Sequence, residues 1–163
     1  MVAVYAGSFN PIHLGHLDII KRAVKIFGSV IVIVTDNSAK HYAVSVEDRI
    51  SLVQQAIESE MLDSYVEVIR LEEGESVADF CMAETVDVLV RGIRSNADMA
   101  FELMMAEVNK DNKIETVFLP CDPVHSNYSS TMVRECVKYN MPITRYVPIG
   151  IMPIIKEKYK EEN

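Results

Sequence analysis

One run of the sequence, Val30–Val34, is apolar at every position and reads VIVIV. A strand with no polar face must be covered on both sides, which is typical of a parallel sheet between layers of helices. Short apolar runs predict four more strands at residues 2–6, 65–71, 86–90 and 116–119, and the second strand extends over residues 30–35. The run at 65–71 mixes polar with apolar residues, so we expect it at an edge of the sheet.

Amphipathic stretches separate these runs and predict helices. Four apolar residues from Leu17 to Phe27 recur at helical spacing, and Gly28 ends that segment. Ser45 is a candidate cap for the next helix. Helices are expected over residues 46–57, 77–84, 98–110 and 130–139. Right-handed crossovers then predict an α/β fold, an open doubly wound parallel sheet of five strands, Rossmann-like, in the order 3-2-1-4-5 with helices on both faces.

Length and charge limit the alternatives. A chain of 163 residues predicts a single domain over residues 1–163, in which about 144–163 form a C-terminal loop and helix. The net charge of −8 disfavours nucleic acid or an anionic membrane as partner. No signal-peptide pattern and no run of about 18 apolar residues occurs, so we expect a cytoplasmic protein. Cys81, Cys121 and Cys136 lack metal-site spacing and are expected to be reduced packing residues.

Four polar clusters follow the predicted strands. They read GSFNPIHLGH at residues 7–16, TDNSAK at 35–40, RGIR at 91–94 and HSNYSST at 125–131. Ligands of open parallel sheets bind beyond the carboxyl ends of the strands, where the strand order reverses. We therefore expect the four clusters to form one site.

The first cluster has the features of an anion-binding turn. Glycine permits close backbone approach, Asn10 and Pro11 favour a turn, and a helix begins near His13, so free N–H groups would face a bound phosphate. His13 and His16 project from one face of this helix. Capping or packing is one alternative for them, and metal binding is another, although no cysteine or carboxylate stands nearby at ligand spacing. The positive end of the helix disfavours the charged imidazolium form, so we expect His13 and His16 to act as hydrogen-bond donors. We predict no metal ligands.

Two of these segments, and one between them, resemble a known family. GSFNPIHLGH resembles the GxFxPxHxGH motif of the nucleotidylyltransferase superfamily, and residues 128–131 (YSST) with Arg134 resemble its second motif, ISSTxxR. RGIR at 91–94, continued by Asp98 and Glu102, is similar to the segment typical of bacterial pantetheine-phosphate adenylyltransferases. The resemblance covers about residues 1–135. It implies transfer of AMP from ATP to 4′-phosphopantetheine, giving dephospho-CoA and pyrophosphate in coenzyme A biosynthesis.

The resemblance also implies roles for individual residues. ATP would contact Ser8, Phe9, His16, Gly92, Ile93, Arg94, Glu102, His125, Ser126, Asn127, Tyr128, Ser129, Ser130 and Thr131. Phosphopantetheine would contact Ser8, Lys40, Val77 and Arg91. The catalytic residues would be His16, Lys40 and Arg91. Family members are alike in using Mg²⁺, here expected to be carried by ATP, and in forming homohexamers.

Electrostatics supports part of this assignment. Both substrates are polyanions, so Lys40, Arg91 and Arg94 would lower their repulsion and neutralise charge on the α-phosphate. A solvated surface position is the alternative for a lone Lys or Arg, but these residues follow predicted strands. No Cys or Ser with a neighbouring base is evident, which favours direct in-line attack by the substrate phosphate. The hydroxyls of residues 129–131 can cap a helix and bind phosphate together.

Four positions depart from the bacterial pattern. Asn10 stands where Asp is usual, His13 replaces Thr, Phe101 replaces Tyr, and Tyr128 replaces Ile. Asn10 and His13 make the first motif resemble that of nicotinamide-mononucleotide adenylyltransferases, and such an enzyme is the first alternative. A cytidylyltransferase is the second. A non-catalytic adenine-nucleotide sensor is the alternative from another class. Residues 99–108 (MAFELMMAEV) are apolar nearly all round, which predicts a contact between subunits.

Overall fold

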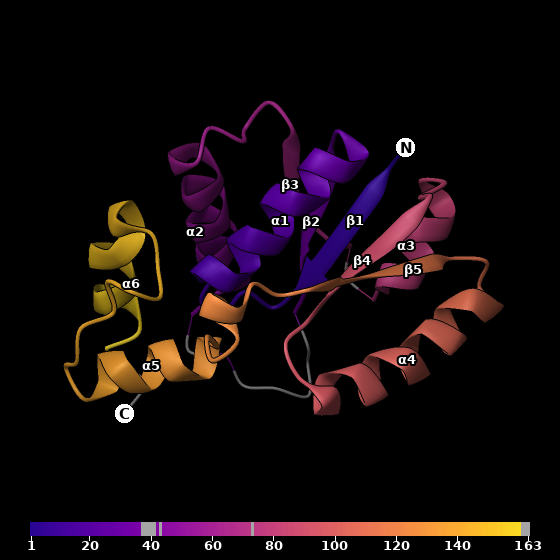
Figure 1. The fold of residues 1–163 in the computed structure, drawn as a ribbon. Coiled ribbons are helices and arrows are strands. Elements are labelled where there is room, and N and C mark those ends of the chain that lie inside the picture. Colours follow the sequence, from indigo (N-terminus) through magenta and orange to yellow (C-terminus); the bar gives the residue numbers. More distant parts are fainter. Residues whose placement is uncertain (37–41, 43, 73, 161–163) are drawn as a thin grey trace.

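The computed structural model describes residues 1–36, 42, 44–72 and 74–160 of the chain. Five strands form one sheet: β1 (Ala3–Gly7), β2 (Val30–Val34), β3 (Val66–Arg70), β4 (Val88–Ile93) and β5 (Glu115–Pro120). Their order is β3-β2-β1-β4-β5 and every neighbouring pair is parallel, as Figure 1 shows. The predicted strand order and the edge position of the third strand are confirmed.

Helices cover both faces of the sheet. They are α1 (Leu14–Phe27), α2 (Val46–Ser59), α3 (Val77–Ala83), α4 (Asn96–Asp111), α5 (Ser130–Lys138) and α6 (Met152–Lys158). The larger core lies between the sheet and α1 and α2, and it takes in Tyr5 of β1 and Val133 of α5. On the opposite face, Val4 packs with Cys81 of α3. Alternate residues of β1 thus belong to different cores, as expected for a strand buried on both faces.

Local signals fix most helix ends. Gly28 has φ 89° after α1, a conformation that glycine adopts without strain. Ser45, Ser76 and Ser95 each accept a hydrogen bond from the backbone of the first turn of α2, α3 and α4. The boundaries predicted from apolar spacing and capping therefore agree closely with the structure.

Strand β4 differs from its prediction. It spans Val88–Ile93 rather than residues 86–90, because Arg91, Gly92 and Ile93 pair in register with the last residues of β5. These three residues lie inside the sheet and not in a loop beyond it. The difference places Arg91 within the sheet, paired in register with Phe118 of β5.

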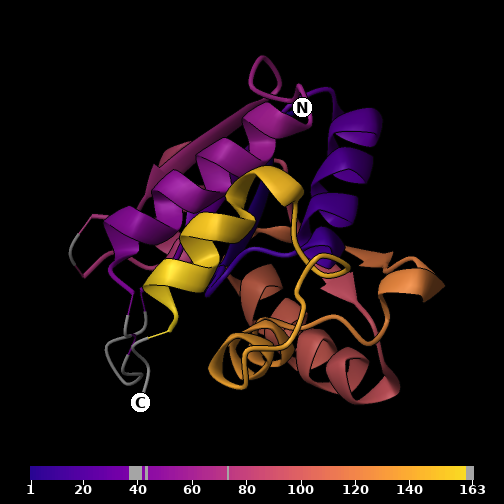
Figure 2. The ribbon, with the colours of Figure 1, turned by 90° about the vertical axis from the view of Figure 1, so that its left-hand side faces the viewer.

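The C-terminal segment packs against α2. Figure 2 shows α6 alongside α2, and Lys158 forms an ion pair with Asp48 at 2.8 Å. Ile155 and Tyr159 are 0% and 1% exposed and belong to the larger core. Up to residue 160 this segment consists of a loop and the short helix α6, and it completes the core beside α2. Within the described part of the chain, no helix has both the length and the apolar character needed to cross a membrane.

Candidate active site

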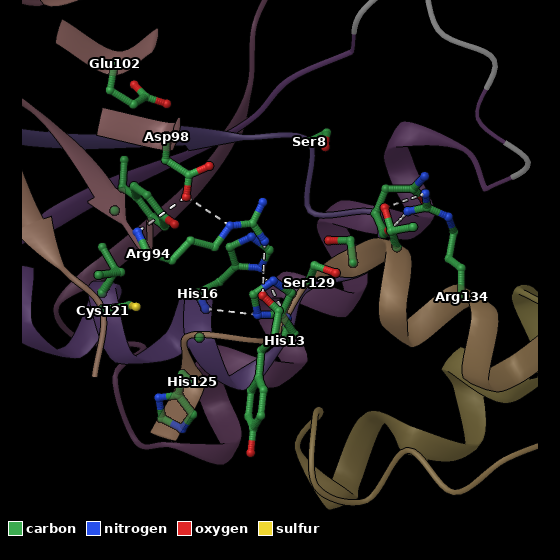
Figure 3. A pocket seen from close by; sticks show the side chains of 18 of the residues that line it. Ser8, His13, His16, Arg94, Asp98, Glu102, Cys121, His125, Ser129 and Arg134 are labelled. Atoms are coloured by element: carbon green, nitrogen blue, oxygen red, sulfur yellow. Dashed lines mark hydrogen bonds and ion pairs between the residues drawn. The ribbon is translucent and has the colours of Figure 1, made fainter. Parts of the chain in front are cut away.

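The strand order reverses at β1, which has β2 on one side and β4 on the other. Beyond the carboxyl end of β1, a pocket of about 650 Å³ opens between the start of α1, the start of α4 and the start of α5. This is the position that the topology of an open parallel sheet predicts for a ligand. Figure 3 shows labelled side chains from all three segments directed toward this pocket.

The first wall of the pocket is the turn between β1 and α1. Ser8 lines the pocket, whereas the neighbouring Phe9 is 1% exposed and turns its ring into the core. That ring packs edge-on against His16, with 5.0 Å between ring centroids. The ring of Phe9 therefore packs against His16 from the side of the core, and it does not line the pocket.

His13 and His16 cap α1 reciprocally. The backbone N–H of His16 donates to Nδ1 of His13 at 3.3 Å, and the backbone N–H of His13 donates to Nδ1 of His16 at 3.2 Å. The two rings stack with centroids 3.6 Å apart. Because each Nδ1 accepts a hydrogen bond, the pattern assigns the proton of each neutral ring to Nε2. Each Nε2–H can then donate to a ligand in the pocket.

Both imidazoles are held neutral. Burial is the main reason that the pKa of His13 is lowered to about 3, and the charges of Arg94 and His125 act in the same direction. Burial also lowers the pKa of His16 well below its usual value, with His13 and Arg94 acting in the same direction. A neutral imidazole at a helix N-terminus is a weak base that can donate through its N–H, and the donor role expected for His13 and His16 stays a prediction.

Arg94 spans the pocket from the end of β4. Its Nε donates to Asp98 at 3.0 Å, and its Nη1 donates to the carbonyl oxygen of Tyr128 at 3.2 Å. The guanidinium therefore joins the first turn of α4 to the segment that precedes α5. Nearly half of its side chain remains exposed, so it keeps a charged surface toward solvent and ligand.

The start of α5 is tied to the first wall. Ser129 accepts from the backbone N–H of Met132 at 3.1 Å and is the helix cap, as predicted for one of the three hydroxyl residues. Ser130 donates to the carbonyl oxygen of Pro11 at 2.8 Å, and Arg134 donates to that of Asn10 at 2.5 Å. The turn before α1 and the start of α5 are thus held side by side.

Arg91 is not a free cation. Its Nε and Nη2 each donate to a carboxylate oxygen of Glu102 at 2.6 Å, and Nη1 donates to the carbonyl oxygen of Ala6 at 3.3 Å. Burial lowers the pKa of Arg91, but hydrogen bonding and attraction to Glu102 outweigh it, so the pKa is raised overall. Glu102 lines the pocket, yet both of its oxygens are engaged by this arginine.

Most of the predicted ATP residues lie together in the pocket: Ser8, His16, Gly92, Arg94, Glu102, His125, Tyr128, Ser129, Ser130 and Thr131. Among the described residues, the predicted site residues that do not line it are Phe9, Val77, Arg91, Ile93, Ser126 and Asn127. Val77 packs on the smaller core under α3. Lys40 lies outside the described residues.

The pocket also contains residues that sequence reasoning assigned no role. Tyr5, Ile19 and Tyr42 line it, and so does Cys121, which was predicted to be a packing residue. Cys121 directly follows β5, and that position was the signal that could have identified it. Burial and the charge of Asp18 raise the pKa of Cys121, so its sulfur is held as a thiol.

Two residues that line the pocket carry a buried polar atom for which the described part of the chain offers no hydrogen-bond partner. Oδ1 of Asn10 and Nδ1 of His125 have no hydrogen-bond partner within the described ranges. Unsatisfied buried polar groups are rare in folded proteins, and both residues line the pocket. The part of the chain that the structure describes holds no group of three or more His, Cys, Asp or Glu placed to bind a metal ion.

The sheet order and the helix starts around one pocket are typical of an open α/β fold that binds a ligand beyond the carboxyl ends of its strands. A family model described as cytidylyltransferase-like matches residues 4–136. The chain is 38% identical to the phosphopantetheine adenylyltransferase of Thermotoga neapolitana over 99% of this chain and 98% of the relative. It is 40% identical to that of Paenarthrobacter aurescens, over 92% and 89% of the two chains. The chain belongs to the phosphopantetheine adenylyltransferase family.

A solved structure supports the fold alone. A provisionally assigned nicotinate-nucleotide adenylyltransferase from Vibrio parahaemolyticus superposes with a TM-score of 0.75, over 98% of this chain and 95% of that chain. The two sequences are 21% identical. The architecture is therefore shared with a protein that is named for a different substrate, so the fold alone does not identify the substrate of this chain.

Proposed function

We propose that this protein transfers AMP from ATP to 4′-phosphopantetheine, giving dephospho-CoA and pyrophosphate. The observation that carries the proposal is the convergence of the three family segments, through Ser8, Arg94 and Ser129, on one pocket at the carboxyl end of β1. Membership of the phosphopantetheine adenylyltransferase family supports it independently.

The reaction is a direct displacement. An oxygen of the phosphopantetheine phosphate attacks the α-phosphorus of ATP, the new P–O bond forms, and the bond to the oxygen that bridges the α- and β-phosphates breaks to release pyrophosphate. Cys121 is held as a thiol, and Ser129 and Ser130 are occupied by the backbone contacts described above. These side chains are poor nucleophiles, which favours transfer without an enzyme-bound intermediate.

The residues of the pocket then act by positioning and charge stabilisation. Nε2–H of His13 and of His16 donate to oxygens on the reacting phosphate, where charge develops in the transition state. The N-terminus of α5 and Arg94 attract the remaining phosphates of ATP. Lys40, Val77 and Arg91 stay predicted contacts of phosphopantetheine, with Arg91 acting from within its ion pair.

Mg²⁺ belongs to this proposal as a partner of ATP. The two carboxylates that line the pocket, Asp98 and Glu102, already accept hydrogen bonds from Arg94 and Arg91. Such a donor set fits a cation held mainly by phosphate oxygens and water, which is the usual mode of Mg²⁺ at nucleotide sites. Bound Mg²⁺ would neutralise charge on the leaving pyrophosphate. A cytoplasmic location is also part of the proposal, and the free thiols of all three cysteines suit a reducing compartment.

The decisive assay measures pyrophosphate release from ATP with phosphopantetheine, with nicotinamide mononucleotide, or with neither. We expect release with phosphopantetheine alone, accompanied by dephospho-CoA. Release with nicotinamide mononucleotide would support the alternative suggested by Asn10 and His13. ATP binding with no turnover on either substrate would support the sensor hypothesis.

We also propose that α4 is a contact between copies of this chain. Phe101, Met104, Met105 and Val108 share one face of the helix and are between 37% and 55% exposed. Contiguous apolar surface of this kind on a folded protein marks an interface. Light scattering should show an oligomer, a hexamer by family resemblance, and Met104→Glu should dissociate it. A wild-type monomer at micromolar concentration would end this proposal.

A further inference from the structure

Arg49 of α2 is the largest fully buried side chain among the described residues, and it is 0% exposed. Its Nη1 donates to the carbonyl oxygens of Ser8 at 2.6 Å and Thr35 at 2.9 Å. Its Nη2 donates to Oδ1 of Asp36 at 2.7 Å, and its Nε donates to the carbonyl oxygen of Val44 at 3.3 Å. Four of its five N–H groups are therefore engaged, three of them just beyond the carboxyl ends of β1 and β2 and the fourth in the segment before α2.

Two residues that Arg49 contacts belong to the pocket. Ser8 lines it from the turn after β1, and Tyr42 lines it from the segment before α2. The ring of Tyr42 lies over the guanidinium, with 4.3 Å from the guanidinium carbon to the ring centroid. One buried cation thus fixes the backbone at Ser8 and the ring at Tyr42 simultaneously.

Packing does not explain a guanidinium at this place. Burying a charge costs several kcal/mol, and an apolar side chain of similar size often stabilises a core equally well. The Asp36 carboxylate that pairs with Arg49 is itself half exposed, which weakens the compensation. What the guanidinium supplies, and an apolar residue does not, is a planar fork that joins separate carbonyl groups in fixed geometry.

We propose that Arg49 is a positioning residue of the active site, which holds Ser8 and Tyr42 in register on one wall of the pocket. The inference rests on the proposed adenylyl transfer and adds Tyr42 to the ligand-contacting residues. A displacement of about 1 Å at such a wall is enough to reduce turnover substantially.

The test is a double-mutant cycle of Arg49→Lys and Tyr42→Leu. Lysine keeps the charge but has neither the fork nor the flat surface, so we expect a loss of about tenfold or more in kcat for ATP and phosphopantetheine. If Arg49 acts through Tyr42, the double variant should be less impaired than the product of the single effects by about threefold or more. Effects that multiply independently, or a folded Arg49→Lys with wild-type kcat, would overturn the proposal.

Two further variants keep the test sharp. Arg70→Lys alters an exposed arginine of β3 that pairs with Glu47, a residue of α2 as Arg49 is. This variant should leave kcat unchanged. Should Arg49→Lys fail to fold, Asp36→Ala releases one side of the guanidinium and should show the same coupling to Tyr42→Leu. Absence of coupling there would also refute the inference.

The wild type separates this proposal from the proposed function. Turnover by the wild type with equal turnover by the Arg49 variants refutes only the positioning role. If the wild type shows no turnover, the proposed function fails, and ATP affinities from calorimetry then replace kcat in the same cycle.

Discussion

Removing the side chain of His16 tests the central chemical role. His16→Ala deletes the Nε2–H donor and also the Nδ1 acceptor of the backbone N–H of His13. A preorganised donor to developing charge contributes about 10²–10³-fold to kcat, which corresponds to roughly 3–4 kcal/mol. Loss of the capping acceptor should lower the free energy of unfolding by about 1 kcal/mol, or about 2–4 °C in Tm.

Gly28→Ala is the matched control. It changes the same helix at the end away from the pocket, where φ is 89° and no atom lies within 4 Å of an added Cβ. The strain should destabilise the fold by about 1–2 kcal/mol, comparable to the loss in His16→Ala. We expect steady-state pyrophosphate release to be unchanged in Gly28→Ala and reduced at least about 10²-fold in His16→Ala. A His16→Ala enzyme within about twofold of wild-type kcat would refute the assigned role.

Acidification should weaken folding through the histidines. Their pKa is lowered on folding, so the stability from the neutral forms is present above about pH 6.5 and is lost as pH falls toward the folded pKa. In urea unfolding, the free energy of unfolding should decline below about pH 6.5 by up to about 1.4 kcal/mol per pH unit per histidine, and His13→Asn should make this decline shallower. A wild-type free energy of unfolding that does not change with pH contradicts the prediction. Glu102→Gln should lower the free energy of unfolding by about 2 kcal/mol, since Arg91 loses its charged partner; thermal denaturation with an unchanged Tm would rule this out. Gly92→Ala places a Cβ 3.0 Å from a side-chain carbon of α1, so ATP affinity measured by calorimetry should fall about tenfold or more, and wild-type affinity would refute the close fit. Raising salt from about 0.05 to 0.2 M should change KM for ATP by less than about threefold, and a steep rise would show long-range attraction instead.

Much of the fold followed from local pattern. The all-apolar β2 required cover on both faces, and serine and glycine fixed the helix ends at positions such as Ser45 and Gly28. The extension of β4 could not be predicted, because it depends on pairing with β5 and not on its own residues. Propensity describes a segment in isolation, whereas register is decided by the partner strand.

For the candidate site too, local residue patterns predicted one part and missed another. Residues of the motifs at the start of α1 and α5 were predicted to lie together, because helix starts bind anions, and the structure brings them to one pocket. The Arg91–Glu102 pair and the clamp at Arg49 were missed. Arg49 did carry a signal, since it falls three residues after Val46 and four before Val53 on the apolar face of α2. A charged residue on a buried helical face is a reason to look for the contacts that compensate it.

The charge of the pocket is compatible with the proposed binding of two polyanions by an acidic protein. The chain carries a net charge of −8, but the carboxylates of the pocket, Asp98 and Glu102, are each paired with an arginine. The other donors, His13 and His16, are uncharged, and the N-termini of α1 and α5 add partial positive charge at contact distance. Surface carboxylates farther away are screened over a Debye length of about 8 Å at physiological salt. Attraction by the pocket is therefore short-range, and it depends on the geometry that the capping contacts and Arg49 maintain.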